Sequence, residues 1–225
     1  METRRRIRSF VLRAGRITAG QERALGELWP VYGVDTGDSP LDLDALFGRS
    51  APRCLEIGFG AGEVIGTLAE ANPHIDYLGI EVHRPGIGRL LLRAEQAKLT
   101  NLRVICRDAV EILEGALVDR SLDEILVFFP DPWHKKRHHK RRLIDSRFLA
   151  CAAAKLRPSG VLRLATDWQN YAEQMLQAGN TCPELESLSA DATYVARPDF
   201  RPLTRFESRG ARLGHGVWDL AYKRR

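Results

Sequence analysis

Short apolar runs alternate with amphipathic stretches through the middle of this 225-residue chain. The runs have the length and composition of buried strands. They predict strands at 53–57, 77–81, 102–106, 123–129 and 160–166. Between them, apolar side chains recur at helical spacing, which predicts helices at 62–71, 85–98, 109–115 and 143–156, and one that opens after Asp167 as its N-cap. Such alternation is typical of a doubly wound, mostly parallel sheet.

The two ends of the chain depart from this alternation. Residues 1–50 read as a basic arm that leads into a short helix. Near the other end, 193–196 and 217–223 predict two further strands, one of them antiparallel. We therefore expect an α/β domain with a seven-stranded sheet in residues 51–225, preceded by a basic N-terminal extension.

A glycine-rich turn follows the first expected strand. Gly58, Gly60 and Gly62 alternate with other residues there. Glycine lets the backbone approach a ligand closely and turn into the N-terminus of a helix. The spacing is GxGxG, whereas dinucleotide-binding proteins have GxGxxG. Glu56 stands at the end of the strand, where its carboxylate would repel a pyrophosphate but suits an ammonium group.

Two more acids stand at the ends of the next two strands. Glu81 closes the second strand, where an acid accepts hydrogen bonds from a ribose diol. Asp108 follows the third strand, and it and the backbone of Ala109 can meet an adenine edge. These positions match an adenosine that carries an amino acid instead of phosphates, which is S-adenosylmethionine. Each acid alone is more often a helix cap or a solvated loop residue, and the glycine spacing disfavours a nicotinamide cofactor.

Segment 128–142 is the most informative stretch of the chain. The fourth expected strand ends in a stiff turn in which Pro130 and Pro132 flank Asp131. Residues 134–142 then contain six cations and three histidines. An acid held at a strand end beside such a run indicates catalysis on a nucleic acid. A proline-rich turn followed by a solvated basic loop is the alternative.

Positive charge is concentrated in two segments. The chain has 34 Lys and Arg against 29 Asp and Glu, a net charge of +5. The run 134–142 contributes six positive charges and residues 1–16 contribute a net five, so the remainder is acidic. Positive segments on an otherwise acidic protein indicate a polyanionic partner.

Other features narrow the class of protein. Cys54, Cys106, Cys151 and Cys182 lack metal-binding spacing and read as reduced thiols of a cytosolic protein, so no metal is expected. No apolar run approaches the ~18 residues that span a membrane. The N-terminus lacks the apolar segment of a secretory signal. We expect a cytoplasmic protein without membrane contact, and no obligatory protein partner is evident.

Together these motifs resemble those of the bacterial tRNA (guanine-N7)-methyltransferases, which modify guanosine 46 in the variable loop of tRNA. The most specific part is the turn 130–132 that runs into Lys-Lys-Arg-His-His-Lys-Arg-Arg. The glycine turn is specific only to the wider class of methyltransferases. The resemblance spans nearly the whole chain, and its other matching segments are 8–10, 15–16, 79–81, 166–168, 204–207 and 209–210.

The resemblance implies a class I, S-adenosylmethionine-dependent methyltransferase domain in residues 51–225, with tRNA as its partner. It implies that four acids line the cofactor site, with the last at the catalytic position: Glu56, Glu81, Asp108 and Asp131. The substrate contacts that it implies are Lys135, Asp167, Thr204, Arg205, Phe206 and Glu207. The RNA contacts that it implies are Arg137, His138, His139, Lys140, Arg141 and Arg142.

Several alternatives stay open on the sequence alone. The protein could methylate another RNA, a small molecule or a protein, or it could bind RNA without catalysis. Asp167 reads equally well as a helix cap, and Glu207 could simply pair with an arginine of its own segment. Trp133 and Trp168 fit core packing better than stacking on a base.

Overall fold

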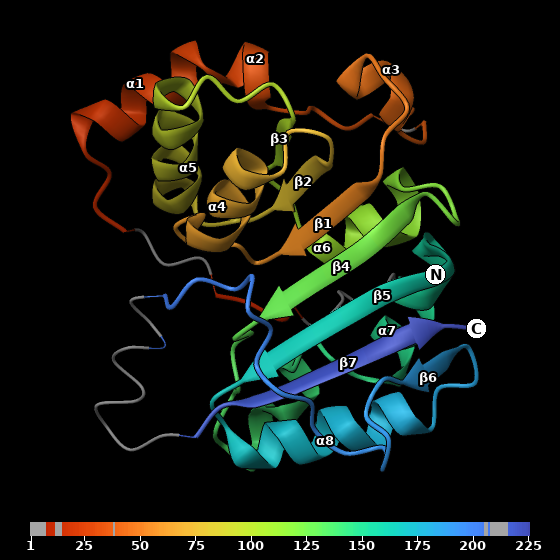
Figure 1. The fold of residues 1–225 in the computed structure, drawn as a ribbon. Coiled ribbons are helices and arrows are strands. Elements are labelled where there is room, and N and C mark those ends of the chain that lie inside the picture. Colours follow the sequence, from red (N-terminus) through yellow and green to blue (C-terminus); the bar gives the residue numbers. More distant parts are fainter. Residues whose placement is uncertain (1–7, 12–14, 38, 205–206, 208–215) are drawn as a thin grey trace, which may run out of the picture.

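The computed structural model describes residues 8–11, 15–37, 39–204, 207 and 216–225. Its centre is a sheet of seven strands in the order β3-β2-β1-β4-β5-β7-β6 (Figure 1). The strands are β1 (Arg53–Ile57), β2 (Asp76–Ile80), β3 (Leu102–Ile105), β4 (Leu122–Phe128), β5 (Leu156–Thr166), β6 (Leu185–Ser187) and β7 (Trp218–Arg224). Strands β1 to β5 are parallel, and β7 runs antiparallel to both β5 and β6. The expected doubly wound, mostly parallel sheet is confirmed.

Helices cover both faces of this sheet (Figure 1). One face packs against α1 (Ala19–Glu27), α4 (Glu63–Ala71) and α5 (Arg84–Gln96). The other packs against α6 (Ala109–Glu111), the π-helical turn η1 (Ile112–Ala116), α7 (Ser146–Lys155) and α8 (Gln169–Asn180). The remaining helices are α2 (Trp29–Tyr32), α3 (Leu43–Phe47) and the 3₁₀ helix η2 (Lys136–Arg141). No helix in the described ranges has the length and apolar composition of a membrane span.

Burial explains why the central strands were readable from the sequence. Every residue of β2 is buried, and β1 is buried from Cys54 onward. A parallel strand that is covered on both faces needs apolar residues at nearly every position. The continuous apolar runs therefore predicted β1 to β4 to within a residue at each end.

The last strands differ from the expectation. Strand β5 begins at Leu156, four residues before the predicted start, and β6 lies at 185–187. The predicted strand 193–196 is wrong: within it, Val195 forms an isolated bridge with Asp219. The last three residues of β7 already pair with β6. A strand-like composition therefore does not by itself decide which segment pairs with a sheet, because β propensity depends on its surroundings.

Two helix starts also differ. The helix predicted from 143 begins at Ser146, because Asp145 caps it by accepting the Phe148 N–H at 2.8 Å. The N-cap of α8 is Trp168, so the prediction of Asp167 as N-cap is wrong. The Thr166 hydroxyl accepts the Trp168 N–H at 3.2 Å.

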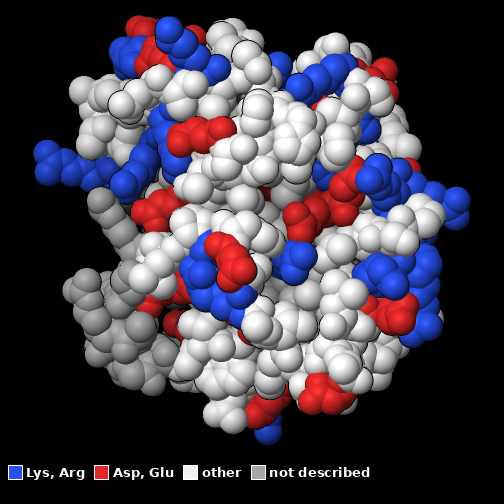
Figure 2. All heavy atoms as spheres, in the orientation of Figure 1, with Lys and Arg blue, Asp and Glu red and all other residues white. Residues whose placement is uncertain are grey.

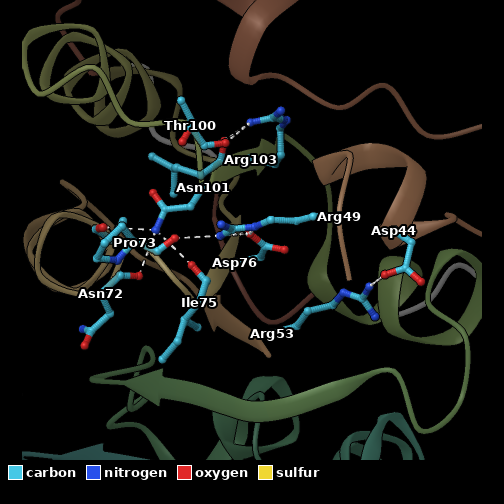
Figure 3. A network of polar contacts seen from close by, with 12 residues as sticks. Asp44, Arg49, Arg53, Asn72, Pro73, Ile75, Asp76, Thr100, Asn101 and Arg103 are labelled. Atoms are coloured by element: carbon cyan, nitrogen blue, oxygen red, sulfur yellow. Dashed lines mark hydrogen bonds and ion pairs between the residues drawn. The ribbon is translucent and has the colours of Figure 1, made fainter. Parts of the chain in front are cut away.

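A polar network that contains the buried Asp76 and Asn101 joins residues 44–53 to the amino-terminal edge of the sheet (Figure 3). Asp76, at the start of β2, is 1% exposed and accepts Arg49 Nε at 2.8 Å. Asn101 precedes β3 and is also buried. Its side-chain amide donates at 2.9–3.1 Å to the carbonyl oxygens of Ala69, Asn72 and Ile75. Asn101 therefore holds the loop between α4 and β2.

Asn101→Ala is expected to lower the free energy of unfolding by about 2–4 kcal/mol, because it leaves buried carbonyl groups without their donor. Urea denaturation measures this change. Cofactor affinity should stay as in the wild type, because the network lies at the edge opposite the carboxyl ends of the strands. The control is Asn180→Ala, which removes one exposed bond to the Ala192 carbonyl and should cost ~0.5 kcal/mol. Equal losses in both variants would contradict the prediction.

Candidate functional site

A cavity of about 640 Å³ opens at the carboxyl ends of β1, β2 and β4. Strand β1 lies between β2 and β4, which is the switch point where open α/β sheets bind their ligands. The walls come from the turns after the first four strands and from residues 9–11, the short red segment beside the arrowhead of β4 in Figure 1. Of the expected cofactor residues, the cavity lining includes Gly58, Glu81, Ala109 and Asp131.

The turn after β1 forms an open cradle of backbone. Gly58, Gly60 and Gly62 have φ angles of 72°, 56° and 74°, a region that only glycine adopts readily. Among the described residues, a β-carbon on Gly58 or Gly60 would meet no atom within 4 Å. On Gly62 it would come within 2.7 Å of Leu90. Gly62 thus permits the packing of α4 on α5, and the other two leave room for a ligand against the backbone.

Glu56 lies directly before this cradle. It is 4% exposed, and within the described chain its Oε2 has no hydrogen-bond partner. Burial raises the pKa of Glu56 to about 8; the Ile65 backbone partly offsets this rise and Glu81 adds to it. A buried carboxyl with an orphan oxygen beside an open cradle fits a ligand that brings a positive charge. The amino-acid end of S-adenosylmethionine has that charge, so the residues present fit this cofactor.

Glu56→Gln is expected to abolish proton release on cofactor binding. The Glu56 carboxyl is mostly protonated at pH 7, because its pKa lies near 8, whereas a ligand ammonium needs the ionised form. S-adenosylhomocysteine should therefore release about one proton per site from the wild type, measured by calorimetry in buffers of different ionisation enthalpy. The Glu56→Gln variant should release no proton, and it should bind S-adenosylhomocysteine ~1–3 kcal/mol more weakly than the wild type does. Glu63→Gln, at the start of α4, serves as the control, and equal release by wild type and Glu56→Gln would refute the prediction.

Backbone N–H groups hold the acids that follow β2 and β3. Glu81 accepts three such bonds at 2.7–3.0 Å, from Gly60, Val82 and His83. Asp108 accepts the Val110 N–H at 3.0 Å and so caps α6. A carboxylate offers about four acceptor positions, so both acids are oriented and still have room for a ligand hydroxyl or amine. The sequence did not predict that Glu81 also holds the glycine turn by accepting the Gly60 N–H.

Asp131 lies exposed on the cavity wall, in the turn after β4. The residues on either side of the turn have unusual backbone angles, with φ of 55° at Phe129 and 47° at Trp133. The Phe129 N–H donates to the Ala165 carbonyl at 2.8 Å. The Trp133 indole N–H donates to the Ser9 carbonyl at 2.9 Å. These contacts hold the turn, and they tie residue 9 to the site, a link that the sequence did not predict.

The basic run forms η2 beside the cavity. Lys135 and His138 belong to the cavity lining. The exposed cations of the run are Lys135, Lys136, Arg137 and Lys140. The guanidinium of Arg141 lies 4.8 Å from the centre of the Trp133 ring, and desolvation together with the surrounding cations lowers the pKa of His138. Helix η2 therefore presents several cations to solvent next to Asp131.

The face of the molecule drawn in Figure 2 carries both signs of charge. Figure 2 shows Lys and Arg side chains interspersed with Asp and Glu. Ion pairs such as Arg23–Glu95 at 2.7 Å and Arg93–Glu70 at 2.6 Å join helices of one layer. Segment 132–144 contains no acidic residue. Positive potential therefore gathers at η2.

Arg142 differs from the rest of the run. It is 4% exposed, and its guanidinium donates at 2.7–2.9 Å to oxygens of Pro132, Asn170 and Gln174. Its Nη2 also lies 3.1 Å from the Nε2 of the half-buried His139. A buried guanidinium needs such acceptors. This corrects the sequence expectation: Arg142 joins the turn and η2 to α8, and it is not placed to hold a phosphate.

Asp167 borders a second cavity, of about 570 Å³. Its lining comprises Asp167, Trp168, Gln169, Asn170, Glu173, Gly216 and Trp218. The His134 ring, which lines the first cavity, lies with its centre 4.1 Å from that of Trp168. Trp133 borders the first cavity and Trp168 the second, while Trp168 also packs against the core. The contact between His134 and Trp168 therefore lies where the two cavities adjoin.

The expected substrate segment 204–207 is described at its two ends, and Arg205 and Phe206 lie outside the described residues. The Glu207 N–H donates to the Thr204 hydroxyl at 3.1 Å. Glu207 is 4% exposed, and its Oε1 accepts from Arg201 at 2.9 Å and Arg197 at 3.2 Å. The sequence did not single out either arginine, because no local motif links them to Glu207.

The comparisons with known proteins agree with this geometry. The family described as putative methyltransferase matches residues 50–220. The chain is 56% identical to the tRNA (guanine-N(7)-)-methyltransferase of Edwardsiella ictaluri (strain 93-146), over 98% of this chain and 92% of the relative. It is also 56% identical to the protein of that name from Burkholderia vietnamiensis (strain G4 / LMG 22486), over 98% of this chain and 86% of the relative.

Solved structures resemble the fold at low sequence identity. The 16S rRNA methyltransferase KamB matches with a TM-score of 0.59 and 15% identity, over 86% of this chain and 98% of that chain. The aminoglycoside resistance methyltransferase NpmB1 matches with a TM-score of 0.56 and 16% identity, over 82% of this chain and 92% of that chain. These likenesses confirm the class I methyltransferase fold. Taken with the full-length relatives, they show that the chain belongs to the family of tRNA (guanine-N(7)-)-methyltransferases.

Proposed function

We propose that this protein transfers a methyl group from S-adenosylmethionine to N7 of guanosine 46 in the variable loop of tRNA. The observation that carries the proposal is the shared cavity: the glycine turn and Glu81 form one side and Asp131 another, and η2 adds cations beside it. The names of the relatives support the tRNA substrate and the guanine N7 position.

The proposed cofactor site uses the turns after β1, β2 and β3. Gly58 and Gly60 would receive the amino-acid end against the backbone, with Glu56 facing its ammonium group. Glu81 would accept the ribose hydroxyls, and Asp108 with Ala109 would meet the adenine edge. When bound, S-adenosylmethionine supplies an electrophilic methyl group on a positively charged sulfur.

Methyl transfer to guanine N7 requires correct placement of the reactants and compensation of charge. It requires no general base. Guanine N7 has an exposed lone pair and carries no proton at neutral pH. The nucleophile must lie in line with the methyl at about 3–3.5 Å, and this orientation can supply several kcal/mol. The base gains positive charge during transfer. We propose that Asp131 holds the guanine N–H donors and balances that charge, with Asp167 on the neighbouring strand end as a second acceptor.

A tRNA loop suits this site better than a duplex. N7 lies in the major groove of A-form RNA, which is too deep and narrow for side chains. We propose that the cations Lys135, Lys136, Arg137, Lys140 and Arg141 hold phosphates and set the position of the RNA without reading its sequence. His138 and His139 would add polar contacts or support. We also propose that residues 204–207 contribute to substrate binding, with Glu207 acting through its arginine partners.

We further propose the arrangement of the whole chain. Residues 1–50 would form the basic arm and short helix, and residues 51–225 the methyltransferase domain. All proposed site residues come from one chain, so the enzyme would need no obligatory protein partner. Because tRNA is the substrate, it would work in the cytoplasm.

Incubation of unmodified tRNA with methyl-labelled S-adenosylmethionine tests the proposal. Nucleoside analysis after digestion should find the label in 7-methylguanosine. A tRNA with adenosine in place of guanosine 46 is the matched control and should stay unlabelled. Label in another nucleoside would favour methylation at a different RNA position, and binding of tRNA without any transfer would favour a non-catalytic module.

A further inference from the structure

Arg201 places a fully buried guanidinium next to the proposed site. Its Nη1 and Nη2 bind the two carboxylate oxygens of Asp219 at 2.7 and 3.0 Å. Its Nη2 also donates to Glu207 Oε1 at 2.9 Å, and Arg197 reaches the same oxygen at 3.2 Å. The buried Arg201 therefore faces two buried carboxylates, and the exposed Arg197 supplies a second positive charge at the edge of this cluster.

This one side chain contacts three separate parts of the fold. Asp219 belongs to β7, and Glu207 ends the proposed substrate segment. The guanidinium carbon also lies 5.0 Å from the centre of the Phe128 ring and 5.3 Å from that of Phe129. Both phenylalanines line the cavity. Arg201 thus lies between the cavity wall, strand β7 and Glu207.

Stability alone does not account for this cluster. Replacing a buried ion pair by apolar residues of similar volume is often neutral or stabilising. In the described part of the chain, the Nε of Arg201 has no hydrogen-bond partner, so the guanidinium is not even fully satisfied. What a guanidinium provides is direction, because its planar fork holds two carboxylates at set angles, which an ammonium group cannot do.

We infer that Arg201 is a positioning residue for methyl transfer, which holds the cavity wall formed by Phe128 and Phe129 in one geometry relative to Glu207. The inference rests on the proposed function. Phe129 leads through Pro130 to Asp131, so a shift of this wall carries Asp131 with it. Arg201 is not among the described residues that line either cavity, and it acts through these neighbours.

Arg201→Lys tests the inference, because it keeps the charge and removes the fork. We expect kcat to fall about 100-fold, the scale of a displacement of ~1 Å at the reacting groups. KM for tRNA and the affinity for S-adenosylhomocysteine should stay within about threefold of wild type, since the groups that would bind both remain. Single-turnover rates at saturating tRNA, measured well below the unfolding temperature, isolate this step.

Arg163→Lys is the matched control. Arg163 also combines an ion pair, to Glu124 at 2.6 Å, with an aromatic contact, 5.2 Å from the Phe200 ring. It is not among the described residues that line either cavity. Its replacement should leave kcat near the wild-type value, so a loss confined to Arg201→Lys supports positioning.

A second variant covers the case in which Arg201→Lys fails to fold. Arg201→Met with Asp219→Leu replaces the buried pair by apolar groups and leaves Glu207 paired with Arg197. This protein should fold, and its kcat should still be lowered about 100-fold. A kcat within about threefold of wild type in either folded variant would overturn the inference, and failure of both to fold would make Arg201 a residue of stability alone. A wild type that does not methylate tRNA would overturn the proposed function itself.

Discussion

Asp131→Asn is expected to lower kcat for tRNA methylation about 100-fold or more, the scale for loss of one preorganised electrostatic contact in the transition state. The change keeps the shape of the side chain and removes its charge. The turn should persist, because the Phe129 N–H, the Trp133 indole and Arg142 hold it through contacts that do not involve the Asp131 side chain. Single-turnover methylation of a tRNA transcript, followed as 7-methylguanosine formed, measures the effect.

The binding steps provide the control for Asp131→Asn. Affinity for tRNA should stay within about threefold, since phosphate contacts supply most of it. Asp199→Asn changes an exposed carboxylate that belongs to the lining of neither cavity and should leave kcat unchanged. Near-normal turnover of a folded Asp131→Asn protein would reduce Asp131 to a turn residue and direct attention to Asp167.

Replacing Lys136, Arg137 and Lys140 together with Ala should weaken tRNA binding on the order of 100-fold at ~0.15 M salt, if each cation holds one phosphate. The dependence of log affinity on log salt should flatten by roughly 2–3 units, because each lost contact contributes about 0.7–0.9. Different tRNAs should weaken about equally, since phosphate contacts carry no sequence information. Filter binding over a salt series measures both quantities.

An equal loss of charge elsewhere controls for a general electrostatic effect. Lys98, Arg120 and Arg157 are exposed and lie near the amino-terminal ends of strands, at the opposite edge of the sheet. Their triple replacement should change the salt slope by less than about one unit. Cofactor affinity should be unchanged in both triple variants, because the cations of η2 are exposed and the cofactor groups are on other turns. A similar slope change in both would mean that net charge matters and the position of η2 does not.

Local sequence predicted those parts of the site whose members are neighbours along the chain. The glycine turn follows β1 directly, and Asp131 precedes the basic run by a few residues. The central strands were equally readable, since burial on both faces demands a continuous apolar run. Strand β1 was predicted with the bounds that the structure shows, Arg53–Ile57.

Residues that meet only through the fold were misread or missed. Arg142 has the same local sequence as its exposed neighbours, yet Asn170 and Gln174 of α8 supply acceptors that bury it. Segment 193–196 has a strand-like composition, but within it only Val195 forms a bridge with β7, whose other end pairs with β6. The residues next to Arg142 or to segment 193–196 in the sequence do not indicate these outcomes. The outcomes depend on how α8 and β7, which are distant in the chain, pack against them.

The sequence by itself determined the alternation of strands and helices from β1 to α8, the glycine turn with Glu56, and the acid with its basic run. These features rest on periodicity, backbone freedom and charge, which act between residues close in the chain. Only the tertiary structure decided that β1 lies between β2 and β4, that Ser9 meets Trp133, and that Arg201 joins Asp219 to Glu207. The reason is that a polar group that loses water on burial costs free energy unless it gains a hydrogen-bond partner. Packing supplies that partner, and it can lie anywhere along the chain.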